Sequence, residues 1–213
     1  MKITNFTANT LNARRIYHAP NPVYINFKGN ESQNFIENLD AGKYDAAIAQ
    51  AKKANFPIND ILPGNAHAPL LAAMEMQAPK KLIEALVAHP GLNPNKLFYE
   101  GTTSYLDSAI KSENFDTFKL LLTSPNLNRK YGYQNNINPN IQNKHCETPL
   151  QRVMINNLKD FARELLKHPQ TKPEIYDGPE TVNSLKTYAS ELYAKRKIDP
   201  EMRKIVDDYY KNK

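Results

Sequence analysis

The sequence predicts an all-α fold in which helix–turn–helix repeats of similar length stack into a solenoid, preceded by an extended N-terminal segment. Two observations predict it. The segment at residues 138–169 has close relatives at residues 58–90 and 92–125, and self-similar segments of this length are typical of stacked repeat proteins. In addition, 40% of the residues are hydrophobic, which is enough to fill a core shared between neighbouring repeats.

The first helix of each repeat is predicted from one recurring apolar pattern. A leucine is followed three positions later by a smaller residue and four positions later by a bulky one, so the three side chains share one helix face. This order suits a helix that is packed between neighbouring repeats. The pattern occurs as Leu70, Ala73 and Met74, as Leu106, Ala109 and Ile110, and as Leu150, Val153 and Met154.

The second helices are predicted to end at an apolar pair that a proline follows three residues later. Proline cannot continue a helix and disfavours the helical conformation of the residue before it. The linkers that follow share the triplet Asn-Pro-Asn, at residues 93–95 and 138–140. The pairs and their prolines are Leu86-Val87 with Pro90, Leu121-Leu122 with Pro125, and Leu165-Leu166 with Pro169.

Thr148-Pro149-Leu150 and the preceding residues 140–147 resemble the ankyrin repeat, a β-turn followed by two helices with the pattern T-P-L-H-x-A. The chain is similar to a divergent, bacterial-type ankyrin repeat protein over residues 31–211. It departs from the family where the motif histidine is replaced by Leu71, Asp107 and Gln151, and proline-containing links replace the usual glycine after the second helix. The resemblance implies finger loops and first helices that line a groove for another protein.

The chain is expected to consist of an N-terminal segment and five repeats, with the first and last repeats as end caps. In residues 1–30, Val23, Ile25 and Phe27 alternate with other residues in a strand-like period. This segment is expected to be extended, either laid against the first repeat as a lid or present as a disordered tail. The repeats are expected at residues 31–60, 61–96, 97–137, 138–172 and 173–213.

The third repeat contains an insertion at residues 128–137, with Tyr131 and Tyr133 beside a basic pair. Insertions in repeat proteins often lie on the binding face. The alternative is a tolerated surface loop, because lengthening a loop costs little entropy.

The last repeat is predicted as a turn at residues 172–181 and two helices. Asp199-Pro200-Glu201 is typical of a helix start, with a cap, a first-turn proline and an acidic residue. Lys195-Arg196-Lys197 lies between the two helices, where the basic side chains are expected to complement a helix carboxyl end. Binding to an acidic surface is the alternative.

Composition limits the compartment and the chemistry. Cys146 is the only cysteine, so an internal disulfide is excluded. The sequence contains no apolar run of ~20 residues and no signal-peptide core, so we expect a cytoplasmic protein or one exported without a cleaved signal. It also has no HExxH, paired CxxC, GxSxG or glycine-rich phosphate loop. We therefore expect no enzyme activity, cofactor or metal, and structural roles for His89 and His168 at the ends of second helices.

The expected function is binding of a partner protein, by a monomer, with no small-molecule substrate. Tyrosine in a polar turn has no core to fill and is enriched at interfaces, although such rings could instead shield their own loops. The resemblance adds the residue at the end of each first helix to the groove. The expected site residues are Phe98, Tyr99, Tyr131, Tyr133, Tyr176, Glu75, Lys111 and Ile155.

The alternative function is binding to an acidic surface, a nucleic acid or an anionic membrane, through the ends of the chain. Residues 1–28 contain four basic residues and no acidic one, and residues 183–213 contain eight basic and five acidic residues. The rest of the chain is close to neutral, so nucleic acid is not the expected partner.

Overall fold

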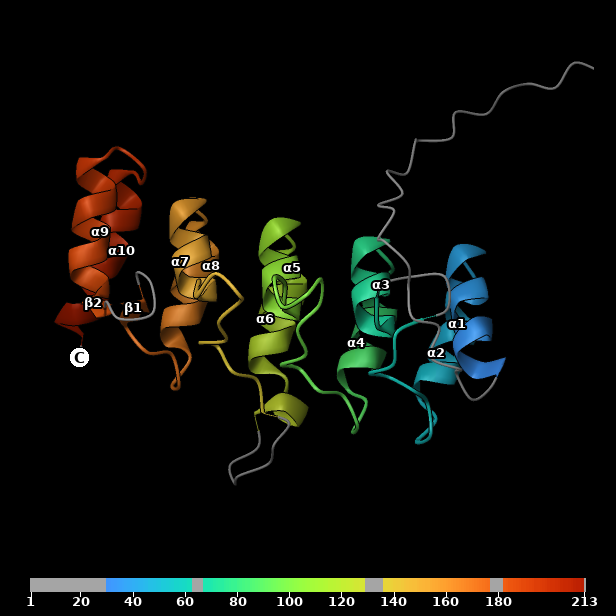
Figure 1. Ribbon diagram of the computed structural model, residues 1–213. Helices are drawn as coiled ribbons and strands as arrows, with labels where there is room; N and C mark the ends of the chain where they lie inside the picture. Colours follow the sequence, from blue (N-terminus) through green and yellow to red (C-terminus); the bar gives the residue numbers. More distant parts are fainter. Residues whose placement is uncertain (1–29, 63–66, 129–135, 177–181, 213) are drawn as a thin grey trace, which may run out of the picture.

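The computed structural model describes residues 30–62, 67–128, 136–176 and 182–212. Within these ranges the helices form five consecutive pairs in a single row (Figure 1), which confirms the helical fold class. The pairs are α1 (Asn30–Asp40) with α2 (Tyr44–Ala51), α3 (Pro69–Glu75) with α4 (Lys80–Val87), α5 (Tyr105–Lys111) with α6 (Phe115–Thr123), α7 (Pro149–Ile155) with α8 (Lys159–Lys167), and α9 (Leu185–Ala194) with α10 (Pro200–Lys211).

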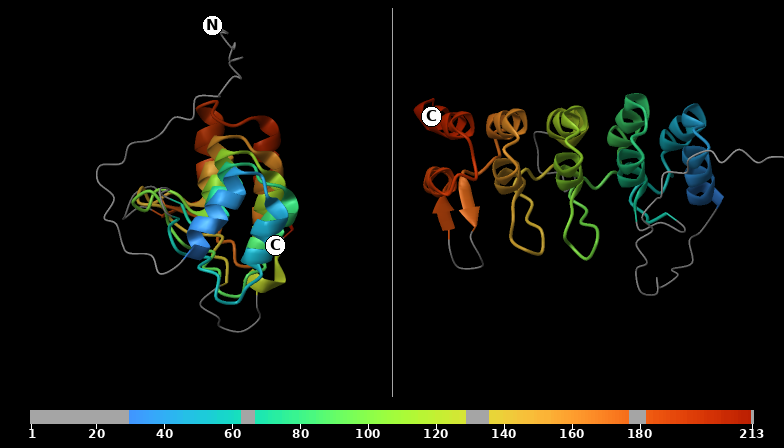
Figure 2. Two further views of the ribbon diagram at one scale, coloured as in Figure 1. Left: turned by 90° about the vertical axis from the view of Figure 1, so that its right-hand side faces the viewer. Right: turned by 90° about the horizontal axis from the view of Figure 1, so that it is seen from above.

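The pairs stack as two layers of helices. The second helices pack on one another in sequence order from α2 to α10, and α1, α3, α5 and α7 form the other layer in the same way. Figure 2 shows that the finger loops between the pairs project from one side of the two layers. The last finger packs on α9, a first helix, so the fingers and the first helices share one face.

Every helix pair turns through the same backbone conformation. One residue per turn has a positive φ, and the N–H of the following residue bonds to the carbonyl five positions earlier, at 2.8–2.9 Å. This is the Schellman arrangement, which satisfies carbonyl groups at a helix end. The left-handed residues are Gly42, Gln77, Glu113, Asn157 and Arg196, with φ between 52° and 67°.

Two of the first helices, α5 and α7, have side-chain N-caps although neither has a histidine at its third position. Ser104 and Thr148 each form a capping box, in which the third helical residue, Asp107 or Gln151, bonds back to the backbone N–H of the cap. In α3 the corresponding third residue is Leu71, and no side chain caps the helix. The capping boxes of α5 and α7 therefore pair a hydroxyl side chain with an acidic or an amide side chain.

The linkers between pairs are joined by one repeated asparagine contact. Each of three asparagines donates its side-chain amide to a carbonyl of the next linker and accepts a bond from an N–H of that same linker. Both ends of the amide are therefore used across a repeat boundary. The partners are Gly91 and Asn93 for Asn59, Asn136 and Asn138 for Asn95, and Gln170 and Lys172 for Asn140, at 2.6–2.8 Å.

Backbone hydrogen bonds close the fingers. The Leu62 N–H donates to the His67 carbonyl at 2.8 Å, and the Asn143 N–H donates to the Glu147 carbonyl at 3.1 Å. Phe98 and Thr103 form an isolated antiparallel bridge. The segment at residues 172–181, which the sequence predicts as a turn without strands, differs in the structure. Two short antiparallel strands are present here, β1 (Glu174–Tyr176) and β2 (Val182–Ser184), and they pair Ile175 with Asn183.

The core follows the predicted helix faces. The leucine, smaller and bulky positions of the first helices are all buried, as is Leu122 at 2% exposure. A short 3-10 helix (Pro125–Leu127) follows α6, and the N–H of Ile137 bonds the carbonyl of Leu127 at 2.8 Å, which joins the two ends of the insertion. Tyr131 and Tyr133 lie outside the described residues, as does the N-terminal segment except Asn30, which begins α1.

Both proline-adjacent histidines contact the preceding helix pair. Nδ1 of His89 accepts the N–H of Gly91, so its Nε2 donates to the carbonyl of Lys53 at 3.1 Å. In the same way His168 donates from Nε2 to the side chain of Asn128 at 2.9 Å. These bonds differ from the expected contacts with the last carbonyls of their own helices, because Nδ1 is already occupied by the chain two residues later.

Candidate functional site

A cluster of three polar side chains lies between a finger and a first helix. The Tyr99 hydroxyl donates to Oε1 of Glu75 at 2.8 Å, and Nδ1 of His67 lies 3.0 Å from Oε2 of the same carboxylate. The Tyr99 hydroxyl also contacts Nε2 of His67, and the two rings meet edge to face with centroids 5.3 Å apart. The structure therefore brings together two predicted site residues, Tyr99 and Glu75, with His67, which the sequence did not indicate.

The backbone presents Tyr99 in a strained conformation. Tyr99, Glu100 and Gly101 all have positive φ, at 50°, 58° and 85°. A residue other than glycine in this region costs about 1–2 kcal/mol, and such strain is found preferentially at functional sites. The finger is held by three backbone N–H groups that bond to the Phe98 carbonyl, and by a bond from the Lys144 N–H to the Gly101 carbonyl at 2.8 Å. The Tyr99 side chain nevertheless remains 42% exposed.

The electrostatics of this cluster suit recognition. Burial and the neighbouring Glu75 carboxylate raise the pKa of Tyr99 above its usual value, so the phenol stays protonated and acts as a hydrogen-bond donor. Burial lowers the pKa of His67, and Glu75 opposes that effect. A phenol with a raised pKa is a poor nucleophile and a poor base at neutral pH.

Phe98, which the sequence predicts as a partner-binding residue, is buried in the structure. It is only 3% exposed, and its ring packs edge to face on Tyr105 with centroids 5.0 Å apart. The ammonium of Lys96 lies 5.7 Å from the ring centroid. Phe98 thus does have a core to fill, because the bridge with Thr103 turns its side chain inward and leaves it no surface for a partner.

The three predicted helix-end residues occupy equivalent positions. Glu75, Lys111 and Ile155 are the last residues of α3, α5 and α7, and all three are exposed. Only Glu75 contacts Tyr99. Lys111 lines a hollow of about 230 Å³ between α5 and α7, and Ile155 is 44% exposed on the following pair.

Tyr176 is the last residue of β1, in the finger of the last pair. Its side chain is outside what the structure describes, so its predicted role remains a prediction.

A buried ionic cluster supports the next finger. Asp107, 1% exposed, lies 3.3 Å from Nε of Arg152, whose Nη2 bonds Glu147 at 3.0 Å. Arg152 also reaches the Thr102 carbonyl at 3.5 Å, so it joins two helix pairs. Burial raises the pKa of Asp107, while its bonds to Ser104 and the charge of Arg152 oppose this. Arg152 was not singled out from the sequence, because its position gives no sign of a partner 45 residues away.

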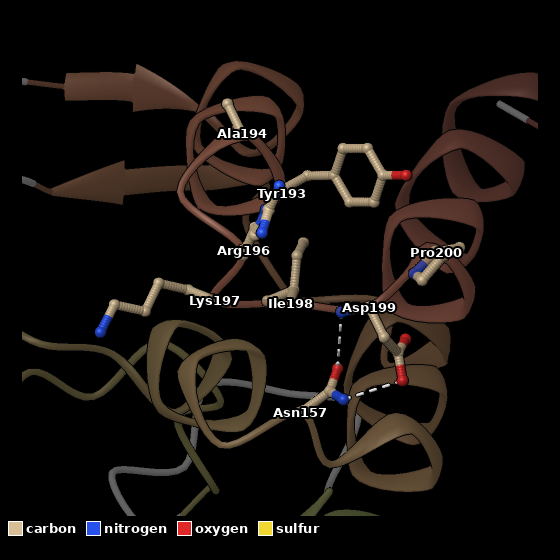
Figure 3. A pocket seen from close by; sticks show the side chains of 8 residues that line it. All are labelled: Asn157, Tyr193, Ala194, Arg196, Lys197, Ile198, Asp199 and Pro200. Atoms are coloured by element: carbon tan, nitrogen blue, oxygen red, sulfur yellow. Dashed lines mark hydrogen bonds between the residues drawn. The ribbon is translucent and has the colours of Figure 1, made fainter.

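A second hollow lies at the turn of the last pair (Figure 3). Its volume is about 570 Å³, and the ring of Tyr193 points across it toward Pro200, with Ile198 between them. Asn157 closes one side through bonds to the Asp199 carboxylate at 2.8 Å and to the Asp199 N–H at 3.4 Å. This hollow also was not predicted, because it depends on how two helix pairs meet.

Other kinds of site find no support in the described part of the chain. No group of three or more His, Cys, Asp or Glu side chains there could hold a metal ion, and no helix there is long and apolar enough to cross a membrane. Comparisons with protein-family models, with curated proteins and with solved structures found no match.

Proposed function

We propose that this chain is a divergent ankyrin-like solenoid that binds a partner protein, without catalysis, in the groove lined by its fingers and first helices. The observation that carries the proposal is Tyr99. A large aromatic side chain is 42% exposed there and is fixed by Glu75 and His67 on a strained finger. A fixed aromatic ring loses little entropy on binding, which is the property of an interface hot spot.

The repeated geometry supports an ankyrin-like assignment. Five pairs share one turn conformation, and the fingers lie on the side of the first helices. The exposed residues Glu75, Lys111 and Ile155 then form a row along three successive pairs. An acidic, a basic and an apolar side chain in one row favour a protein partner, since a nucleic acid would select for basic side chains alone.

The experiment compares Tyr99→Ala with wild type in a pull-down from the native cell, followed by titration of the purified partner. We expect partner affinity to weaken by ~1–4 kcal/mol, the magnitude of a hot spot. Tyr99→Phe separates the ring from its hydroxyl, because it keeps the apolar surface and loses the bond to Glu75.

Tyr44→Ala serves as the matched control, since it removes a half-buried tyrosine at the start of α2, in the layer of second helices away from the fingers. A Tyr99→Ala variant that unfolds at lower temperature yet captures its partner normally would make the ring part of the scaffold and remove the support for this groove. Tyr131→Ala combined with Tyr133→Ala tests the insertion in the same assay.

A further inference from the structure

We propose that the hollow at the turn between α9 and α10 is a second docking site, which binds an acidic peptide segment through one bulky apolar side chain and the carboxylates beside it. This site is separate from the groove and does not depend on Tyr99. Its volume of about 570 Å³ lies within the range of ~300–1,000 Å³ found for ligand sites.

The hollow exists because the last turn is longer than the others. In the third and fourth pairs the left-handed residue is followed directly by the residue that caps the second helix. In the last pair Lys197 and Ile198 are inserted between the left-handed Arg196 and the cap Asp199. The extra residues separate the start of α10 from the end of α9.

The apolar part of the site includes a residue that is exposed at a position where the earlier helix pairs have a buried core residue. Tyr193 stands three residues before the left-handed residue of its turn, as Met74, Ile110 and Met154 do in earlier pairs. Those three side chains are at most 5% exposed, whereas Tyr193 is 45% exposed. Ile198 is 5% exposed and lines the same hollow. An aromatic wall and an aliphatic floor suit one bulky apolar side chain.

The charged part of the site is cationic. Arg196 and Lys197 line the hollow, are exposed, and pair with no carboxylate among the described residues. The one acidic lining residue, Asp199, is already engaged: its carboxylate lies 2.5 Å from the ammonium of Lys159 and accepts bonds from Asn157 and from the N–H of Met202. The unneutralised charge at the hollow is therefore positive.

The surroundings favour a short acidic peptide over a polyanion. Exposed acidic residues interrupt the basic surface at Asp160 and Glu201. A nucleic acid needs a continuous basic track along its backbone, whereas a peptide with clustered carboxylates needs only local charge.

The test uses three fluorescent peptides: Glu-Glu-Phe-Glu-Glu, Glu-Glu-Ala-Glu-Glu and Lys-Lys-Phe-Lys-Lys. We expect the full chain to bind the first at least about fivefold more tightly than either of the others, the effect of one hot-spot side chain. Tyr193→Ala should abolish the preference for phenylalanine over alanine.

The charge variant is Arg196→Gly with Lys197→Ala, because glycine suits the positive φ of 54° and removes the charge without adding backbone strain. It should weaken binding of the acidic peptide by about fivefold or more without lowering the melting temperature. Tyr99→Ala should leave peptide binding unchanged, which separates this site from the groove. Equal binding of all three peptides, no effect of either variant, or tighter binding of a single-stranded oligonucleotide that the charge variant abolishes would each overturn the proposal.

Discussion

The turn residue of each helix pair has a positive φ, yet only the first pair uses glycine there. Glu113 occupies this conformation with an exposed side chain that forms no hydrogen bond or ion pair within the described residues, so its strain is not offset by a contact. Asn157 has the same conformation, but asparagine tolerates it better, and its side chain bonds Asp199 twice. Two residues in one turn position therefore have different consequences for stability.

We expect Glu113→Gly to raise the free energy of unfolding by about 0.5–1 kcal/mol, because glycine relieves the backbone strain of the folded state. The greater conformational entropy of glycine in the unfolded chain offsets part of this gain. Asn157→Gly should lower it by about 0.5–1.5 kcal/mol through the lost side-chain bonds. Urea denaturation of both variants measures the difference. Equal changes in the two would contradict the distinction drawn between them.

His168 makes stability depend on pH. Burial lowers its pKa below the value of an unfolded histidine, and Nδ1 accepts the N–H of Gln170, which protonation would prevent. The unfolded chain therefore binds a proton below about pH 6.5 that the folded chain resists. The contribution of His168 to stability is complete above that pH and is lost as the pH falls toward its folded pKa.

We expect His168→Gln to reduce the fall in melting temperature between pH 7.5 and pH 5.5, because glutamine keeps a donor for Asn128 and does not titrate. His145→Gln serves as the control for the replacement of a histidine by glutamine at an exposed position. A wild-type profile that coincides with that of His168→Gln would refute the assignment. The wild type and the His168→Gln variant contain the same other titratable groups, such as Asp107 and His67. The difference between their pH profiles therefore reports on His168.

At the scale of the element, the linkers are ordered by side chains rather than by regular structure. Asn95 bonds the Asn136 carbonyl at 2.7 Å and the Asn138 N–H at 2.8 Å, so one amide holds the chain on both sides of a repeat boundary. The same contact holds the C-terminal end of the insertion, whose two ends are joined by the bond between Leu127 and Ile137. A long insertion is thus compatible with an unchanged helix spacing.

Asn95→Ala should cost about 1–3 kcal/mol, because the partly buried Asn136 carbonyl and the exposed Asn138 N–H both lose their partner. Asn156→Ala is the control: its amide bonds only the Arg152 carbonyl of its own helix, and the change should stay within about 0.5 kcal/mol. Thermal and chemical denaturation of the two variants measure the costs. Equal costs would show that the contact across the boundary contributes nothing special.

At the scale of the whole molecule, each helix pair packs mainly on its neighbours. The effect of a destabilising substitution should therefore decrease with distance from the substituted pair. The helix α4 packs on α2, α3 and α6. Leu82 lies in it and is fully buried. Loss of its side chain should be felt by the first three pairs more than by the last.

We expect Leu82→Ala to cost about 2–5 kcal/mol and to accelerate amide hydrogen exchange in α1 to α6 more than in α9 and α10. Hydrogen exchange followed by mass spectrometry gives the protection of each pair. Uniform acceleration in all the helices would instead mean that the row of helix pairs unfolds as one cooperative body.

The sequence by itself determined the helices and their buried faces. Apolar spacing, helix-stopping prolines and caps act within a few residues, so Leu70, Leu106 and Leu150 identify one helix face without knowledge of the rest. The recurrence of Asn-Pro-Asn marked the linkers, although the amide contacts of Asn59, Asn95 and Asn140 across each boundary were not foreseen. The sequence does not indicate the strands β1 and β2, because three residues are too few for a periodic signal.

The tertiary structure decided which of the candidate residues meet. Phe98 and Tyr99 are adjacent aromatic residues in one finger, and only the bridge with Thr103 and the positive φ of Tyr99 turn the first inward and the second outward. Tyr99 and Glu75 were each expected in the groove, but their contact joins residues 24 positions apart. Such a contact depends on the offset between stacked helix pairs, which is set by packing across the repeat boundary and leaves no local pattern in the sequence.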